Sequence, residues 1–476
     1  MKIMSTAWRL FRGAMGGENK LCAILAVLLT VLVFMAGQNK LFDHDEFEHA
    51  HSAWYVAQGY VPYLDFFQNH NPLLWYIAAP LVVAIGDHSY LMLILRLITF
   101  GVALGMAAIA AAIAVRISSK PQAGLYAFIL LLSCLLFVEK ALEFRPDVFM
   151  TLLGSMAVYY FIRRGVSPSP SDLVLCGAFC ALSFLFLQKA IFLVVMLSVC
   201  LMVQAARREI RMKSLLWFFL ILGTAPLLLL IFFVAHDAGQ DYIQNTYLMH
   251  LSKLYTFSSW PTFLNSLKLN TGFWALALLG SAFGLYRFRQ DKAVGYLSAI
   301  GLALLLLVSG LQTPWEQYYL QALVLLAAVA SWMLMRLFEK IRAGVFLRFF
   351  ILVILVLLPV LTMLRYRISG NRHQLEAIDL VAQTTRPDEL VYDGDILFNL
   401  FRSDLHYFWY STRPGGNLDL YNKLTRGKYG DYSVCSLIEE KKPRWISTYQ
   451  HLHRCPVYRN YRKDKKFNLY RRIEGQ

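Results

Sequence analysis

Residues 42–76 read FDHDEFEHAHSAWYVAQGYVPYLDFFQNHNPLLWY, the densest set of ionisable, aromatic and turn-forming side chains in the chain. Seven of these ionisable residues fall within nine positions: Asp43, His44, Asp45, Glu46, Glu48, His49 and His51. The stretch lies between two apolar runs, and a plain connector between membrane helices needs no such residues. We therefore predict that this loop carries the chemistry and that the rest of the chain holds it at a membrane surface.

The composition indicates a polytopic membrane protein. Of the 476 residues, 58% are hydrophobic and only 16% are charged, whereas soluble domains average about 45–50% apolar and about 25% charged residues. The net charge of +16 does not indicate nucleic-acid binding, because no recognition motif or basic face accompanies it. Much of the excess lies in short loops beside apolar runs, where the positive-inside rule expects it.

The distribution of charge predicts the topology. The first apolar run, Leu21–Ala36, follows a basic segment and is not followed by a small-residue cleavage site, so we expect a first span with a cytoplasmic N-terminus and no cleavable signal. Further apolar runs cover 73–86, 91–115, 122–138, 147–162, 172–187, 190–206, 214–234, 271–286, 293–310, 317–335 and 345–364. Basic connectors at 116–120, 163–164, 207–213, 287–292 and 340–348 are predicted to be cytoplasmic. The opening loop 38–72, the segments 143–147, 188–189, 236–270 and 312–317, and everything beyond Tyr366 are then predicted to lie outside.

Twelve full spans cannot join an inside N-terminus to an outside C-terminus. The run Leu73–Gly86 is shorter than the roughly 20 residues that a spanning helix needs. We therefore interpret it as a partial or re-entrant helix and predict about eleven full spans. The predicted fold class is an all-α polytopic membrane protein over residues 1–366, followed by a small soluble α/β domain over 367–476.

The C-terminal domain is predicted from its local patterns. Helices are expected over Leu375–Ala382 and Val434–Lys441, and strands over Glu389–Tyr392, Trp445–Tyr449 and Phe467–Arg472, with a turn at Asp393-Gly394-Asp395. Of seven cysteines, only Cys435 and Cys455 lie in polar sequence. If this domain faces an oxidising compartment, these two can form a disulfide.

The crowded carboxylates of the first loop cannot all ionise freely beside a membrane. Some must pair with a cation, bind a metal or take a raised pKa, and such carboxylates suit general acid–base work. A helix over Glu46–Trp54 would bring Glu48, His49 and His51 into reach of a metal, but no HExxH or CxxC signature supports one. A solvated amphipathic helix is the plainer interpretation, and His70 before Pro72 is more simply a hydrogen-bonded cap.

Other outward-facing clusters carry candidate binding residues. Glu143-Phe144-Arg145-Pro146-Asp147 opens an apolar run; it is either a local ion pair with proline at the first helical position, or a site where Arg145 binds phosphate. Lys189 either snorkels or binds an anionic head group. The segment 315–319, with Tyr318 and Tyr319, is either a binding segment or an aromatic belt at the membrane interface. The segment 236–270 is long enough to cover a site as a lid.

These motifs resemble those of GT-C glycosyltransferases, and in particular the protein-mannosyltransferase-like and aminoarabinose-transferase-like bacterial enzymes. The resemblance rests on Asp45-Glu46, Gly59–Tyr63, Asp65-Phe66-Phe67, Pro72–Tyr76, Arg145-Pro146-Asp147, Lys189 and Tyr318-Tyr319. One departure concerns the residues before the second apolar run, where relatives commonly have Lys-Pro-Pro and this chain has His70-Asn71-Pro72. His70 would have to replace that lysine, or Arg145 and Lys189 would bind the phosphate.

The resemblance implies transfer of a sugar from a polyprenyl-phosphate donor to an acceptor hydroxyl with inversion, at the periplasmic face of a bacterial inner membrane. Asp45 would be the base, while Glu46 and Asp147 would orient acceptor or sugar. The implied phosphate- and substrate-binding residues are Arg145, Lys189, His70, Tyr63, Asp65 and Tyr319. The expected partners are the lipid-linked sugar, a glycolipid, glycan or protein acceptor and membrane lipid, without nucleic acid. The cofactor is either none or a divalent metal.

Two rival functions fit the same sequence. A transporter or flippase for a lipid-linked saccharide is expected to carry ionisable residues near the membrane midplane and repeated halves with broken helices. Here the charges gather at one surface and no repeat is visible, which favours an enzyme. An inactive relative that only binds glycolipid is the second rival, and the Asp45-Glu46 pair argues against it.

Overall fold

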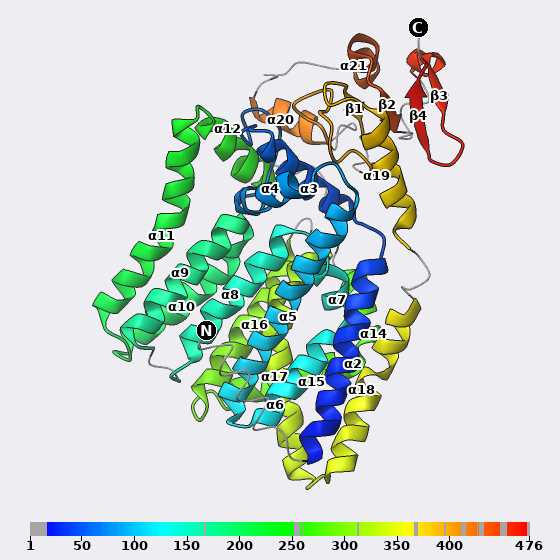
Figure 1. The fold of residues 1–476 in the computed structure, drawn as a ribbon. Helices are drawn as coiled ribbons and strands as arrows, with labels where there is room; N and C mark the ends of the chain where they lie inside the picture. The colour runs from blue at the N-terminus through cyan, green and yellow to red at the C-terminus, as the bar shows by residue number, and fades with distance from the viewer. Residues whose placement is uncertain are drawn as a thin grey trace. The chain divides into compact units, whose positions relative to one another are not determined.

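The computed structural model describes residues 17–165, 168–251, 258, 260–311, 314–365, 370–394, 397–410, 416–425, 427, 433–447 and 455–473 (Figure 1). The basic N-terminal segment up to residue 16, Asp395 and the predicted strand end at Tyr449 lie outside these residues. The chain forms two compact units. Unit 1 comprises Met1–Lys40, Arg96–Pro226 and Phe257–Ser369, and unit 2 comprises Leu41–Leu95, Leu227–Thr256 and Gly370–Gln476.

Unit 1 is a bundle of apolar helices. Its elements are α2 (Gly17–Asn39), α5 (Tyr90–Ser118), α6 (Pro121–Leu132), α7 (Leu135–Ala141), α8 (Pro146–Ile162), α9 (Pro170–Phe186), η1 (Gln188–Ala190), α10 (Ile191–Ala206), α11 (Met212–Ala235), α14 (Trp260–Leu269), α15 (Thr271–Tyr286), α16 (Lys292–Gly310), η3 (Glu316–Tyr319), α17 (Leu320–Lys340) and α18 (Val345–Arg365). Helices α5 and α11 cross the boundary between the two units.

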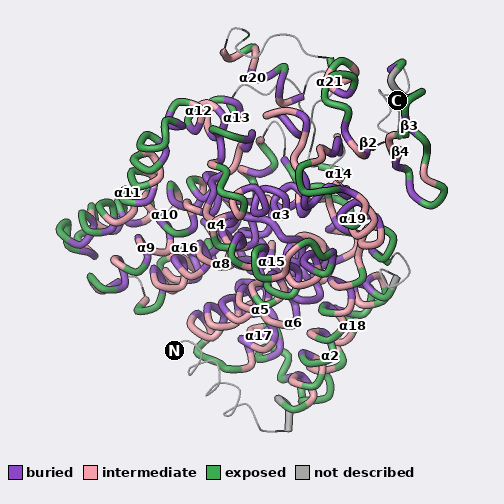
Figure 2. Tube along the Cα trace, turned by 45° about the horizontal axis from the view of Figure 1, so that its top comes forward, coloured by how far each residue is buried: buried purple, intermediate pink, exposed green. Residues whose placement is uncertain are grey.

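Burial differs strongly among these helices. The apolar span that includes α17 is 83% buried, whereas those of α11 and α18 are only 22% and 17% buried. Figure 2 shows the same contrast along the chain trace. An apolar helix that leaves most of its surface uncovered by protein needs lipid to cover it, so α11 and α18 present apolar faces to the bilayer.

The number of spans depends on how broken helices are counted. Among the described residues, seven helices are long and apolar enough to cross a membrane, and two bent pairs raise this to nine. Helices α8 and α9 have 17 residues each and α4 (Leu73–Ile85) has 13. The polytopic helical fold is thus confirmed, while the figure of eleven full spans stays a prediction. The short α4 agrees with a partial helix.

The predicted apolar run 122–138 is not one straight helix, because the chain bends by 72° between α6 and α7. The buried side chain of Asn270 holds this bend. Its amide nitrogen donates to Ser133 O at 3.0 Å, and its amide oxygen accepts from Leu135 N at 3.0 Å. A break in a membrane helix is tolerated only where the freed backbone groups are satisfied by protein, which one asparagine does here.

Unit 2 combines the first loop with the C-terminal segment. Its elements are α3 (His44–Ala57), α4, α12 (Gly239–Ile243), the π-helical turn η2 (Gln244–Leu248), α13 (Met249–Leu251), α19 (Arg372–Thr384), β1 (Val391–Tyr392), α20 (Asn417–Thr425), α21 (Val434–Lys441), β2 (Trp445–Ser447), η5 (Pro456–Asn460), β3 (Tyr461–Lys463) and β4 (Leu469–Arg472). The predicted helices α19 and α21 are present. The patterns missed α20 and β3.

The four strands form one sheet in the order β1-β2-β4-β3. Strand β1 pairs with β2 in parallel, while β4 pairs antiparallel with both β2 and β3. After β1, the Asp393 carboxylate accepts from three successive backbone N–H groups, those of Leu397, Phe398 and Asn399, at 2.7–2.9 Å. The predicted α/β character of this segment therefore agrees with the structure.

The C-terminal segment and the first loop are held together by hydrogen bonds. Phe42 exchanges two bonds with the Gln374 side chain, through its N at 2.8 Å and its O at 3.1 Å. Phe67 N donates to Tyr407 O at 2.9 Å, and Trp409 Nε1 donates to Phe67 O at 3.0 Å. From Leu41 onward, the first loop thus belongs to one compact unit with α4 and residues 370–476. The predicted division at 366/367 describes chain order and remains a prediction.

Cys435 and Cys455 form the disulfide that the sequence allowed, with a Cα–Cα distance of 5.4 Å. The bond closes a loop of 20 residues between α21 and η5. Cross-linking a loop of this length stabilises a protein by about 3 kcal/mol through the unfolded chain.

Replacing both cysteines by serine should therefore loosen the C-terminal sheet. We expect faster proteolysis after Lys441, which ends α21, in the double variant than in the parent chain, measured by limited trypsin digestion of the full protein. A Cys200→Ser variant, which removes a free thiol of α10, should digest like the parent. Equal rates for all three chains would contradict a stabilising disulfide.

Candidate active site

The N-terminus of α3 is built by a capping box. Asp43 has extended backbone angles (φ −78°, ψ 155°) and its side chain accepts from Asp45 N at 3.1 Å. Reciprocally, Asp43 N donates to the Glu46 carboxylate at 3.0 Å. These contacts satisfy backbone N–H groups that a helix start leaves open. Two of the four clustered carboxylates therefore set where α3 begins.

Asp45 differs from its acidic neighbours. It is half-buried in the first turn, whereas Glu46 is 0% exposed and Glu48 is 6% exposed. A carboxylate in the first turn is favoured by the helix dipole. Glu46, predicted to orient acceptor or sugar, accepts from Asp43 N at the cap of α3. The Asp45 carboxylate is therefore half-buried, and it is not one of the two that form the capping box.

Asp404 from the C-terminal segment holds two side chains of α3, His51 and Tyr55. One carboxylate oxygen of Asp404 lies 2.7 Å from His51 Nε2 and accepts from Tyr55 OH at 3.0 Å. His51 Nδ1 faces Leu400 O at 3.1 Å. Burial and then the Asp404 charge raise the pKa of Tyr55 well above its usual value, which keeps the hydroxyl protonated as a donor. Both nitrogens of His51 thus serve this network, and neither is left for a metal.

Glu48, His49 and His70 form a separate cluster. One possible ligand atom from each lies within 4.8 Å of the others, so the structure places His70, rather than the predicted His51, beside Glu48 and His49. Trp75 Nε1 donates to His49 Nδ1 at 3.1 Å. Since the indole can only donate, a neutral His49 ring carries its proton on Nε2 and offers that atom as a donor. This proton would have to leave before His49 Nε2 could ligate a metal, which disfavours a divalent metal site.

We therefore expect sugar transfer to survive removal of metal. After prolonged dialysis against EDTA, with residual metal measured by mass spectrometry, the initial rate should stay within twofold of the untreated protein. A loss that zinc or manganese restores in the parent chain, but not in a His49→Gln variant, would establish a metal at this cluster instead.

Tyr63 and Asp65 shape the turn that follows α3. Tyr63 has a left-handed backbone (φ 69°), is 1% exposed and donates through its hydroxyl to His70 O. The exposed Asp65 carboxylate accepts from Val61 N at 2.6 Å. Both residues were predicted to bind substrate, and both have contacts that hold the turn in place. The side chain of His70 itself stacks at 6.0 Å on His250.

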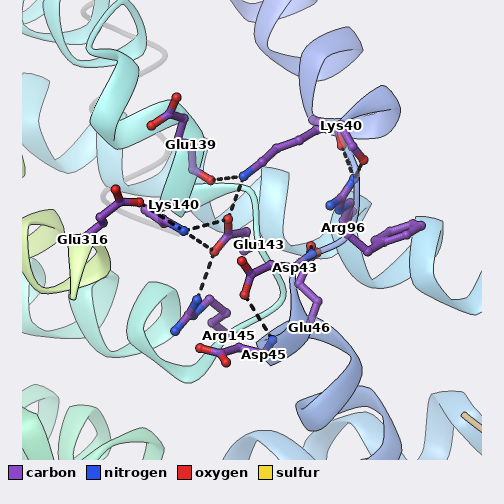
Figure 3. Close-up of polar contacts among 12 residues, drawn as sticks. Lys40, Asp43, Asp45, Glu46, Arg96, Glu139, Lys140, Glu143, Arg145 and Glu316 are labelled. Carbon is purple, nitrogen blue, oxygen red and sulfur yellow. Dashed lines mark hydrogen bonds and ion pairs between the residues drawn. The ribbon is translucent and has the colours of Figure 1, made fainter. Parts of the chain in front are cut away.

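In unit 1, Glu143 gathers three cations (Figure 3). Its carboxylate lies 2.6 Å from Lys40 Nζ, 3.2 Å from Lys140 Nζ and 3.1 Å from Arg145 Nη1. Burial would raise the pKa of this carboxyl, but the three positive charges outweigh it and lower the pKa to about 2. Lys140 also pairs with Glu316 at 3.4 Å and Arg145 lies 3.9 Å from Asp147, so three cations and three carboxylates meet in this cluster.

The other predicted residues of unit 1 lie at helix ends. Asp147 is in the first turn of α8, with its carboxylate 3.9 Å from Arg145 Nε. Lys189 lies in η1 with its ammonium 3.9 Å from the centre of the Tyr318 ring, a cation–π contact. Tyr319, predicted to bind substrate, is 0% exposed and packs within unit 1. Tyr318, rather than Tyr319, therefore holds the lysine.

Sequence reasoning missed three charged residues of these clusters. Lys40 and Lys140 look like ordinary flanking lysines, and only the Glu143 contacts reveal their role. Asp404 lies 353 residues from its partner His51, so no local pattern connects the two. The segment 236–270, predicted as a lid, contains α12, η2, α13 and α14 among its described residues.

Comparison with known proteins agrees with this architecture. Residues 69–236 match the family profile of dolichyl-phosphate-mannose-protein mannosyltransferases. No curated protein sequence matches the chain. Among solved structures, ArnT from Cupriavidus metallidurans bound to undecaprenyl phosphate is similar at a TM-score of 0.69 and 12% identity, covering 95% of this chain and 98% of that one. The apo state of that ArnT gives the same TM-score over 94% and 97%.

A more distant likeness has the same fold. The oligosaccharyltransferase of Archaeoglobus fulgidus is similar at a TM-score of 0.59 and 11% identity, over 91% of this chain and 69% of that one. These comparisons agree with the resemblance found in the sequence: the chain has the same fold as ArnT, and residues 69–236 match the protein mannosyltransferase family profile.

Proposed function

We propose that the chain moves a sugar from a polyprenyl-phosphate donor to an acceptor hydroxyl, with inversion and with Asp45 as the base. The observation that carries this proposal is the first turn of α3, where capping occupies Asp43 and Glu46 and leaves Asp45 half-buried and accessible. A general base must reach the proton that it removes, and a partly buried carboxylate on a rigid helix meets this need.

The proposed step balances as a single displacement. Asp45 takes the proton of the acceptor hydroxyl, and the hydroxyl oxygen attacks the anomeric carbon from the face opposite the phosphate. The bond between the anomeric carbon and the phosphate oxygen breaks, and its electron pair leaves with the polyprenyl phosphate. Negative charge therefore grows on the phosphate, where fixed positive charge lowers the barrier most.

Two cationic groups of unit 1 are proposed to bind that phosphate. Arg145 offers a planar donor set that Glu143 holds in place at 3.1 Å. Lys189 is positioned over Tyr318. Asp147 is proposed to orient the sugar or acceptor. His70 stands where relatives have a lysine. We propose that it acts as a member of the cluster with Glu48 and His49, and not as a permanent positive charge.

The reaction is proposed to take place at the periplasmic face of a bacterial inner membrane. Two observations support this. The positive-inside rule puts the first loop outside, and a disulfide between Cys435 and Cys455 persists in oxidising compartments. The named ligand of the similar ArnT structure, undecaprenyl phosphate, is the class of carrier expected there. The acceptor is proposed to be a glycolipid, glycan or protein.

A donor labelled in its sugar tests the proposal. Purified protein in liposomes should release polyprenyl phosphate only when an acceptor extract is present, with label passing to the acceptor. Transfer of intact donor between leaflets without cleavage would instead establish a flippase. Donor binding without cleavage or movement, in the presence of every acceptor fraction of the membrane, would establish a non-catalytic glycolipid-binding protein.

A further inference from the structure

A row of buried polar side chains continues from Asp147 into the helix bundle of unit 1. Thr151 and Ser155 follow Asp147 at intervals of four residues, so all three lie along one face of α8. Thr151 and Ser155 are 0% exposed and Asp147 is 2% exposed. At about 1.5 Å of rise per residue, the row extends about 12 Å along the helix.

Helix α17 closes this row from the other side. A Cβ at Gly154 would lie 2.1 Å from Gln321 Nε2 and 3.0 Å from Leu193 Cδ2. The Gln321 amide therefore rests against the backbone of α8 at Gly154. This glycine precedes Ser155 in the sequence and lies about one helical turn from Thr151. Only glycine at 154 leaves room for a polar group at this point, in the middle of an otherwise apolar helix contact.

The polar atoms of the row have no hydrogen-bond partner among the described residues. They are Asp147 Oδ1, Thr151 Oγ1, Ser155 Oγ and Gln321 Nε2. Ser183, equally buried on α9, behaves differently, since its hydroxyl donates to Met150 O at 2.8 Å. A buried polar atom without a partner costs about 1–3 kcal/mol, so several in one row indicate that something pairs with them.

The chemistry of the row selects the ligand. The ligand must accept from an amide N–H, donate to a carboxylate oxygen and exchange bonds with two hydroxyls. A metal cation fails the first condition, because it cannot accept a hydrogen bond from an amide N–H. Water meets every condition and commonly fills such places with two to four hydrogen bonds.

We infer that this face of α8 binds a file of ordered water molecules, which hydrates Asp147 from within the helix bundle. The water file is defined by Asp147, Thr151, Ser155 and Gln321. All four residues belong to unit 1. The water file does not depend on the proposed transfer reaction, so the two can be tested separately.

Thermal unfolding of the full chain in detergent provides the first test. If Ser155 binds water, Ser155→Ala removes a made hydrogen bond and should lower Tm, as the matched Ser183→Ala change does. If the row is dry, Ser155→Ala removes an unpaired hydroxyl from an apolar contact, and Tm should stay level or rise while Ser183→Ala still lowers it. The second result would overturn the inference.

Radiolytic labelling provides a direct test, because hydroxyl radicals made from bound water oxidise the side chains beside it. Leu193 borders the row, and Leu197, one turn further along α10, is equally buried. We expect Leu193 to be oxidised several-fold faster than Leu197 in the parent chain. The excess should vanish in a Thr151→Val/Ser155→Ala variant. Equal, slow oxidation of both leucines in the parent chain would contradict the water file.

Discussion

Replacing Asp45 by asparagine is expected to lower the rate of sugar transfer by about 10²–10⁴-fold, the contribution typical of a positioned general base. Asparagine keeps the shape of the side chain but cannot take the proton of the acceptor hydroxyl. The initial rate of polyprenyl phosphate release, at saturating donor and acceptor, measures the effect. The loss should fall on kcat, because the base acts in the transition state rather than in binding.

The first turn of α3 supplies a matched control. Asp43 lies two residues away and its side chain accepts from Asp45 N. Asparagine caps helices as well as aspartate does, so Asp43→Asn should leave both folding and rate close to those of the parent chain. Near-normal turnover in Asp45→Asn, or an equal loss in both variants, would remove Asp45 from the role of base.

Replacing Glu143 by glutamine is expected to lower the free energy of unfolding by about 3–5 kcal/mol, because it removes the buried carboxylate that three cations share. The side chain is 1% exposed, and the side chains of Lys140 and Arg145 are only 12% and 4% exposed. Chemical denaturation in detergent micelles measures the change. A second change, Lys140→Met, should recover part of the lost free energy of unfolding, because it removes one of the positive charges that Glu143 balances.

Glu376 is the matched control for this charge cluster. It also pairs with two cations, Lys466 at 2.7 Å and Arg372 at 3.0 Å, but on an exposed surface. Exposed ion pairs contribute little to stability, so Glu376→Gln should unfold like the parent chain. If Glu143→Gln does the same, or if Lys140→Met deepens the loss, the three cations do not depend on Glu143.

The same cluster predicts a dependence on pH. The pKa of Glu143 is lowered to about 2, from an ordinary value of 4.5. A lowered pKa stabilises the folded chain above pH 4.5, and this contribution is lost as the pH falls from 4.5 towards 2. The parent chain should therefore lose more stability over this range than Glu143→Gln, which has no group to titrate there.

Local patterns predicted much of this architecture because their causes are local. The periodicity of Val434–Lys441 gave the bounds of α21, and proline at the first helical position marked the start of α8. The first loop was recognised from its density of acids. Each of these features depends only on residues within one or two helical turns of it.

The remaining features depend on partners far away in sequence. Asn270 satisfies the backbone at a bend 135 residues earlier, and nothing near Ser133 announces it. Glu46 looked like a catalytic acid because its capping contact with Asp43 N appears only in three dimensions. The acids of the first loop could thus be found from the sequence, but not divided between capping and chemistry.

The bond between His51 and Asp404 spans 353 residues, which sets an order of events during synthesis. At about 5–20 residues per second, a ribosome needs roughly 20–70 s to travel between them. Helix α3 therefore lacks its contact with Asp404 until most of the chain has been synthesised. A chain that stalls before Asp404 is therefore expected to lack the contacts that hold His51 and Tyr55 in the complete chain.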